Sequence, residues 1–153
     1  IVNMPPGTGD IQLTLSQSSP LTGAVVVTTP QDIALIDAKK GLKMFEKVNV
    51  PLLGIIENMS VFICPCCGEV THIFGEGGAK RMSEQYGVPM LGELPLSPAI
   101  REAADSGRPT VAAEPESAAA KMYRAIAMKI AGSIAKLGKD YTARMPTISV
   151  KND

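Results

Sequence analysis

The sequence predicts an α/β fold, with a doubly wound, mostly parallel sheet and flanking helices. The first observation is a set of short apolar segments with the character of strands buried on both faces. These segments are residues 23–29, 51–57 and 90–95. The second observation is that helical segments alternate with them, at about residues 31–48, 77–86, 98–106 and 116–137. Because parallel neighbours need a long crossover connection, this alternation favours a parallel sheet covered by helices.

The helix predicted at residues 31–48 shows the pattern most clearly. Its apolar residues recur with a spacing of three, then four, which places them on one face of a helix. They are Leu35, Ala38, Leu42 and Phe45. The apolar, β-branched segment before it ends at Pro30, and another buried strand follows at residues 51–57. We therefore expect this helix to be a crossover connection between two parallel strands.

Two regions fall outside the alternation of strands and helices. The first is a loop at residues 58–75, which is inserted between a strand and a helix. The second is the polar segment 138–153, which contains Pro146 and lacks an apolar period. We expect residues 1–137 to form one domain and residues 138–153 to be a disordered tail.

Composition excludes several classes of function. The chain has 153 residues, with 15 basic and 15 acidic side chains, so no net charge attracts nucleic acid or an acidic membrane. No apolar run approaches the roughly 20 residues of a membrane helix, and no signal segment opens the chain. All three cysteines lie between residues 64 and 67, which favours a reducing compartment over a disulfide framework. We expect a cytoplasmic protein.

The densest chemistry lies in the motif Cys64-Pro65-Cys66-Cys67-Gly68. A Cys-x-x-Cys turn directs two thiolates at one point, and the following glycine eases the tight turn. One pair supplies only two of the four ligands of a tetrahedral zinc ion or a four-cysteine cluster, which suggests that two subunits each contribute a pair. Structural zinc, a thiol-disulfide pair and an inert turn are the alternatives on local grounds.

His72, the only histidine, follows the cysteine motif by five residues. It is either a third ligand, which would make a Cys-Cys-His site within one chain, or an ordinary loop residue. On local grounds, an ordinary loop residue is the better interpretation of His72.

The segment from Met4 to Asp10 carries two glycines, and Ile1-Val2 before it resembles the end of a buried strand, as if upstream sequence were missing. After a strand, such a segment lies at the carboxyl edge of the sheet, where open α/β folds bind ligands. The glycines permit close approach of a phosphate, and Asp10 can cap the next helix. A plain tight turn with a helix cap explains the same residues equally well.

Asn58 and Pro95 follow two other predicted strands. Locally, Asn58 is a polar residue that closes a strand, and Pro95 lies between a strand and a helix that begins with Pro98. Five ordered blocks that include these residues resemble the Mrp/ApbC family of iron-sulfur cluster carrier ATPases, which are deviant P-loop proteins related to MinD and ParA. The blocks cover residues 4–15, 28–38, 57–60, 64–68 and 92–109. The resemblance extends over about residues 1–137 and corresponds to the C-terminal portion of a P-loop ATPase domain.

The resemblance implies a site shared by two chains. In this family, the outer cysteines Cys64 and Cys67 would bridge a [4Fe-4S] cluster between two protomers of a homodimer, and Cys66 has no assigned role. The cluster would pass to recipient apo iron-sulfur proteins, regulated by ATP and Mg²⁺ in the full-length protein. The nucleotide-binding residues that the resemblance implies are Gly7, Thr8, Gly9, Asp10, Asn58 and Pro95.

Two departures from the family pattern concern the ATPase function. The glycine-rich phosphate loop with its lysines is not in this sequence, so we expect this chain not to hydrolyse ATP alone. Asn3 occupies the usual position of the Walker B aspartate, and an amide brings no negative charge to Mg²⁺. The alternative function is a MinD/ParA-like, nucleotide-dependent dimerising regulator with structural zinc at the cysteine pair. The Ala-rich helix at residues 116–137 argues against membrane insertion.

Overall fold

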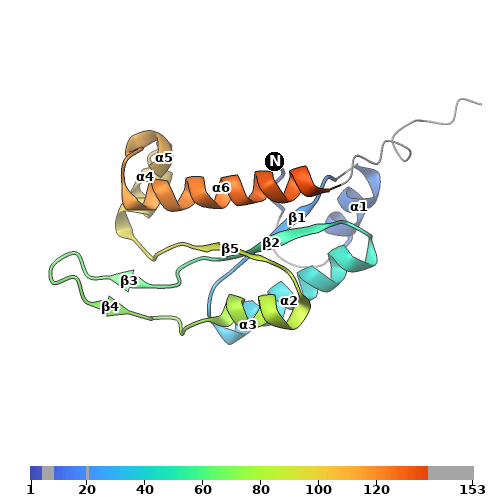
Figure 1. Ribbon diagram of the computed structural model, residues 1–153, viewed down its shortest axis with the longest axis horizontal. Helices are drawn as coiled ribbons and strands as arrows, with labels where there is room; N and C mark the ends of the chain where they lie inside the picture. The colour runs from blue at the N-terminus through green and yellow to red at the C-terminus, as the bar shows by residue number, and fades with distance from the viewer. Residues whose placement is uncertain (5–8, 20, 138–153) are drawn as a thin grey trace, which may run out of the picture.

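A three-stranded parallel sheet forms the centre of the computed structural model, which describes residues 1–4, 9–19 and 21–137. The strands are β1 (Ala24–Thr28), β2 (Leu52–Glu57) and β5 (Met90–Glu93), in the order β1-β2-β5 (Figure 1). Both neighbouring pairs are parallel. The three predicted strands and their parallel arrangement are therefore confirmed.

Helices cover both faces of this sheet. Figure 1 shows α2 (Asp32–Lys47) and α3 (Gly78–Tyr86) on one face, and α6 (Ala118–Lys136) on the other. The short helices α4 (Pro98–Asp105) and α5 (Thr110–Ala113) precede α6. This arrangement confirms the doubly wound α/β class. No helix in the described part of the chain is long and apolar enough to cross a membrane.

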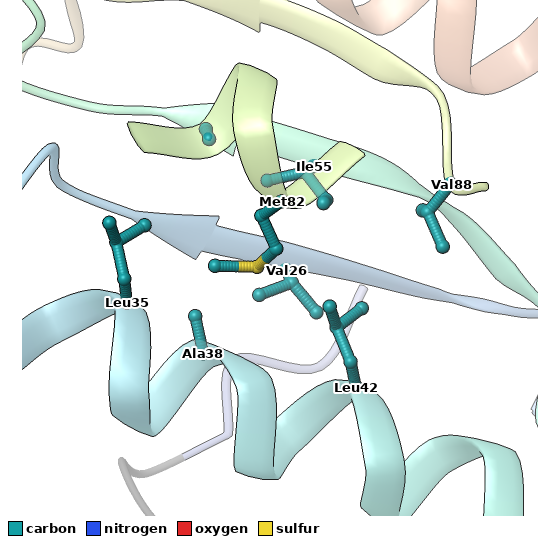
Figure 2. Packing of buried hydrophobic residues seen from close by; sticks show 8 residues of the cluster. Val26, Leu35, Ala38, Leu42, Ile55, Met82 and Val88 are labelled. Carbon is teal, nitrogen blue, oxygen red and sulfur yellow. The ribbon is translucent and has the colours of Figure 1, made fainter. Parts of the chain in front are cut away.

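The larger core cluster lies between the sheet and the helices α2 and α3. Figure 2 shows aliphatic side chains from the strands meeting Met82 and the apolar face of α2. Leu42 and Ile55 are fully buried there. Helix α2 buries Met44 in addition to three of the four predicted positions, whereas Phe45 is only half-buried.

A second, smaller cluster joins the opposite face of the sheet to α6. On this face, Ile126 of α6 forms a buried cluster with Ile56, Leu91 and Leu94. The helix comes close to β5 at Gly92, where an added Cβ atom would lie 2.6 Å from the Cγ1 atom of Ile126. Glycine at this position therefore permits the close packing of α6 on the strand.

The inserted loop contains a small antiparallel hairpin that the sequence did not predict. Its strands are β3 (Phe62–Ile63) and β4 (Val70–Thr71), and Ile63 pairs with Val70. Two-residue strands are too short to show an alternating pattern in the sequence. In Figure 1 the hairpin extends beyond the end of the sheet where β2 and β5 finish.

The N-terminal segment differs from its prediction. Residues 1–4 form no strand, and both Ile1 and Val2 are exposed, at 130% and 61%. Two apolar residues provide few ladder hydrogen bonds and little apolar area, which explains why this segment forms no strand. Helix α1 (Asp10–Ser18) follows, with Gly9 and not Asp10 as its N-cap. The predicted tail, residues 138–153, lies outside the described residues.

Candidate metal and nucleotide site

The cysteine motif forms the tip of the β3–β4 hairpin. The Cys64 N–H donates a hydrogen bond of 2.9 Å to the Glu69 carbonyl, and the Gly68 N–H donates one of 2.8 Å to the Cys64 carbonyl. Gly68 has a φ of +75°, a left-handed conformation that glycine adopts without strain. These bonds close a tight turn around Cys66 and Cys67, as the motif predicts.

The Cys64 sulfur accepts hydrogen bonds from within this turn. The backbone N–H groups of Cys67 and then Cys66 lower the pKa of the Cys64 thiol, and the thiols of the same two residues act in the same direction. Partial burial raises the pKa and opposes them. The thiolate is the form that binds metal, so the turn favours the state that a ligand requires. The turn carries Cys64 and Cys67 three residues apart on one short loop, from which a Cys-x-x-Cys pair can bind one metal ion together.

The hairpin provides only part of a metal coordination shell. Across residues 1–4, 9–19 and 21–137, no three His, Cys, Asp or Glu side chains are grouped so that they could hold a metal ion. His72 is therefore not placed as a third ligand, and its Nδ1 atom lies 3.1 Å from the Ser60 carbonyl oxygen. Cys67 is exposed and Cys64 is half-buried, so a second set of ligands can approach. The donor set fits half of a four-thiolate site.

Asn58 and Pro95 come together at the carboxyl edge of the sheet. The Leu94 N–H donates a hydrogen bond of 2.8 Å to the Glu57 carbonyl, and the Ser60 N–H donates one of 3.0 Å to the Leu94 carbonyl. These bonds place Asn58 beside Pro95, and both residues are half-buried. The Asn58 side-chain oxygen accepts a hydrogen bond from the Met59 N–H at 3.0 Å, which fixes its orientation.

Among the other predicted nucleotide residues, the structure describes Gly9 and Asp10. Helix α1, which begins after Gly9 with Asp10, lies near the end of the sheet where the strands begin, and the hairpin lies at the opposite end (Figure 1). No strand forms in residues 1–4, so the strand end predicted before this segment is absent, and the nucleotide-binding roles of Gly9 and Asp10 stay predictions. Gly7 and Thr8 lie outside the described residues. Asn3 is exposed.

Two polar side chains at the strand ends were not identified from the sequence. Glu57 closes β2, is only 2% exposed, and accepts a hydrogen bond of 2.6 Å from the Ala79 N–H in the first turn of α3. A carboxylate suits the N-terminus of a helix. Thr29 follows β1, and its buried Oγ1 atom has no hydrogen-bond partner among the described residues. For Glu57, the signal available in the sequence was a charged residue at the end of an apolar strand.

The comparisons with known proteins agree with this fold. The chain belongs to the ParA family described as NUBPL iron-transfer P-loop NTPase, whose family model matches residues 1–131. It is 59% identical over 134 residues to the iron-sulfur cluster carrier protein of Escherichia coli K12, covering 88% of this chain and 36% of that protein. It is 55% identical over 130 residues to the mouse iron-sulfur cluster transfer protein NUBPL, covering 85% of this chain and 41% of that protein.

Solved structures give the same fold. A nucleotide-binding protein from Archaeoglobus fulgidus, in complex with ADP, matches with a TM-score of 0.63 and 39% identity, covering 74% of this chain and 46% of that one. The cell division ATPase MinD of Pyrococcus furiosus matches with a TM-score of 0.54 and 31% identity, covering 76% and 44%. The predicted membership in a family of P-loop NTPases is therefore confirmed.

The chain spans less than half the length of these relatives. Its predicted correspondence to their C-terminal portion stays a prediction, and so do the homodimer, the cluster type and the residue roles.

Proposed function

We propose that this chain is part of an iron-sulfur cluster carrier, in which Cys64 and Cys67 of two copies hold one cluster between them. The observation that carries the proposal is the incomplete donor set at the hairpin tip. The tight turn holds Cys64 and Cys67 on one loop, and no third metal-binding side chain is grouped with them among the described residues. An iron-sulfur cluster takes four cysteine ligands, and a two-fold axis supplies the missing pair.

The exposure of the turn suits a cluster that is cargo. Cys66 and Cys67 are exposed, so a recipient's thiols can reach the metal and replace the carrier's ligands one at a time. A structural metal site is usually closed, with all its ligands in one chain. The names of the E. coli and mouse relatives, a cluster carrier and a cluster transfer protein, support the same proposal. The recipients are apo iron-sulfur proteins, and the reducing cytoplasm is the compartment that suits free thiols.

The role of nucleotide in cluster transfer would belong to the full-length protein. Asn58 and Pro95 line the carboxyl edge of the sheet, where α/β folds bind ligands, and they would form the base side of an ATP site. Gly7, Thr8, Gly9 and Asp10 stay candidates for the phosphate side. ATP and Mg²⁺ would regulate cluster transfer in the full-length protein, while phosphoryl transfer depends on loop residues that this sequence lacks.

Anaerobic reconstitution with iron and sulfide tests the proposal. We expect a brown protein with the visible absorption of a cluster and one [4Fe-4S] cluster for every two chains. Cys64→Ser and Cys67→Ser should each abolish the absorption, and the matched control Cys66→Ser should retain it. A colourless protein with one zinc ion for two chains would instead support the zinc-containing regulator. Equal loss in all three variants would overturn the ligand assignment.

A further inference from the structure

The cysteine hairpin is joined to the segment after β5 at Ser60, which is buried, and at the residues that follow it. Ser60 is 5% exposed, and its hydroxyl donates to the Leu94 carbonyl at 3.2 Å, in addition to the bond from its N–H. One residue further, the Leu96 N–H donates a hydrogen bond of 2.8 Å to the Val61 carbonyl. The outgoing arm of the hairpin is therefore fixed on both sides of Pro95.

The returning arm has a different attachment. Strand β4 pairs with β3 at only two positions, and Val70, Thr71 and Ile73 are all exposed. His72 lies between them, and its Nδ1 atom is 3.1 Å from the Ser60 carbonyl oxygen. Because a carbonyl only accepts hydrogen bonds, Nδ1 carries the proton and donates it. The His72 ring thus ties the returning arm to the same buried residue that holds the outgoing arm.

We infer that His72 is a positioning residue for the cluster site, which holds the cysteine turn in a fixed orientation relative to the end of β5. The expected consequence, that the chain with His72 loses its cluster more slowly than a chain without it, rests on the proposed function. Ser60 also bonds to Leu94, the residue before Pro95, and lies two residues after Asn58. The segments that carry Asn58 and Pro95 are therefore connected to the turn through Ser60.

Two variants separate this role from the others. His72→Ala removes the donor, whereas His72→Asn places an amide N–H near the position of Nδ1 and serves as the matched control. In the reconstituted chain, His72→Ala should keep the iron content and the visible spectrum. It should release iron to a ferrous chelator about two- to tenfold faster, the range that one neutral hydrogen bond provides. His72→Asn should release iron at the rate of the unchanged chain.

Hydrogen exchange in the metal-free chain tests the positioning independently of any cluster. The Ser60 and Leu96 amide protons should exchange faster in His72→Ala by a similar factor of about two to ten, and should keep their protection in His72→Asn. If this pattern holds but no cluster assembles, the proposed function fails and the positioning role stands.

Three results would overturn the inference. A changed spectrum or lower iron content in both variants would make His72 a ligand. If the rates of iron release and amide hydrogen exchange are unchanged in His72→Ala, the bond from His72 to Ser60 does not position the turn. If His72→Ala and His72→Asn release iron equally fast, exchange the same amide protons equally fast and lose the same unfolding free energy in urea, then His72 contributes only to general stability.

Discussion

The body of the sheet and the cysteine hairpin differ in how they are held. Between the sheet and α2, side chains such as Leu42 and Ile55 are fully buried in one continuous cluster (Figure 2). In the hairpin, the cross-strand pair of Ile63 and Val70 is 51% and 58% exposed. Apolar burial therefore stabilises the body, while a few hydrogen bonds hold the hairpin. We therefore expect changes in the hairpin to leave the fold of the body intact.

The largest effect should follow from a cavity in the body. Leu42→Ala removes a fully buried side chain and should lower the free energy of unfolding by about 2–5 kcal/mol. Ile63→Ala, the matched change in the hairpin, should alter it by less than about 0.5 kcal/mol. Urea unfolding of the metal-free chain measures both. Equal losses would show that the hairpin belongs to the cooperative core.

A smaller effect should follow from the carboxylate that links β2 to α3 within the body. Glu57→Ala leaves the Ala79 N–H without its partner and should cost about 1–3 kcal/mol. Glu93 is its register partner on β5 but is exposed, so Glu93→Ala should change stability by less than about 0.5 kcal/mol. Urea denaturation curves of the two variants provide the comparison. A neutral Glu57→Ala would mean that α3 does not depend on this cap.

The cysteines should matter for metal and not for folding. Replacing both Cys64 and Cys67 by Ser should leave the unfolding free energy of the metal-free chain within about 0.5 kcal/mol of its original value, because Cys67 is exposed, Cys64 is only half-buried and each change replaces a single atom. Thermal unfolding followed by circular dichroism checks this. A large loss would show that the thiols have a structural role in the turn.

The smallest signal should come from nucleotide. Calorimetric titration of ATP into this chain should give little or no heat, because the sequence lacks the glycine-rich loop that binds phosphates. ADP is the matched titration, since it tests whether the base-side residues bind alone. Tight binding of either nucleotide would contradict the assignment of the phosphate contacts to a missing loop.

The regular elements of the fold could be predicted from periodicity. Buried strands and the amphipathic α2 carry their pattern in the order of residues, so their bounds were predicted to within one or two positions. The β3–β4 hairpin has too few residues for any pattern, and its pairing depends on the turn at Gly68. The short helix α5 was missed for the same reason.

The candidate site was predicted where the residues are local in sequence. The cysteine turn is such a case, and Asn58 and Pro95 meet because parallel strands finish at one edge. The strand predicted to precede Gly9 and Asp10 does not form in residues 1–4, so their site roles stay predictions. The roles of Glu57 and His72 depend on contacts between distant segments, which no local spacing reveals.

Native mass spectrometry of the reconstituted chain, under anaerobic conditions, tests whether two copies share one cluster. We expect a dimer that carries one [4Fe-4S] cluster and separates into monomers when a chelator removes the iron. We also expect the Cys64→Ser chain to stay a monomer without iron. A monomer that retains a complete cluster, or a dimer that holds only zinc, would contradict the claim that Cys64 and Cys67 form half of a shared cluster site.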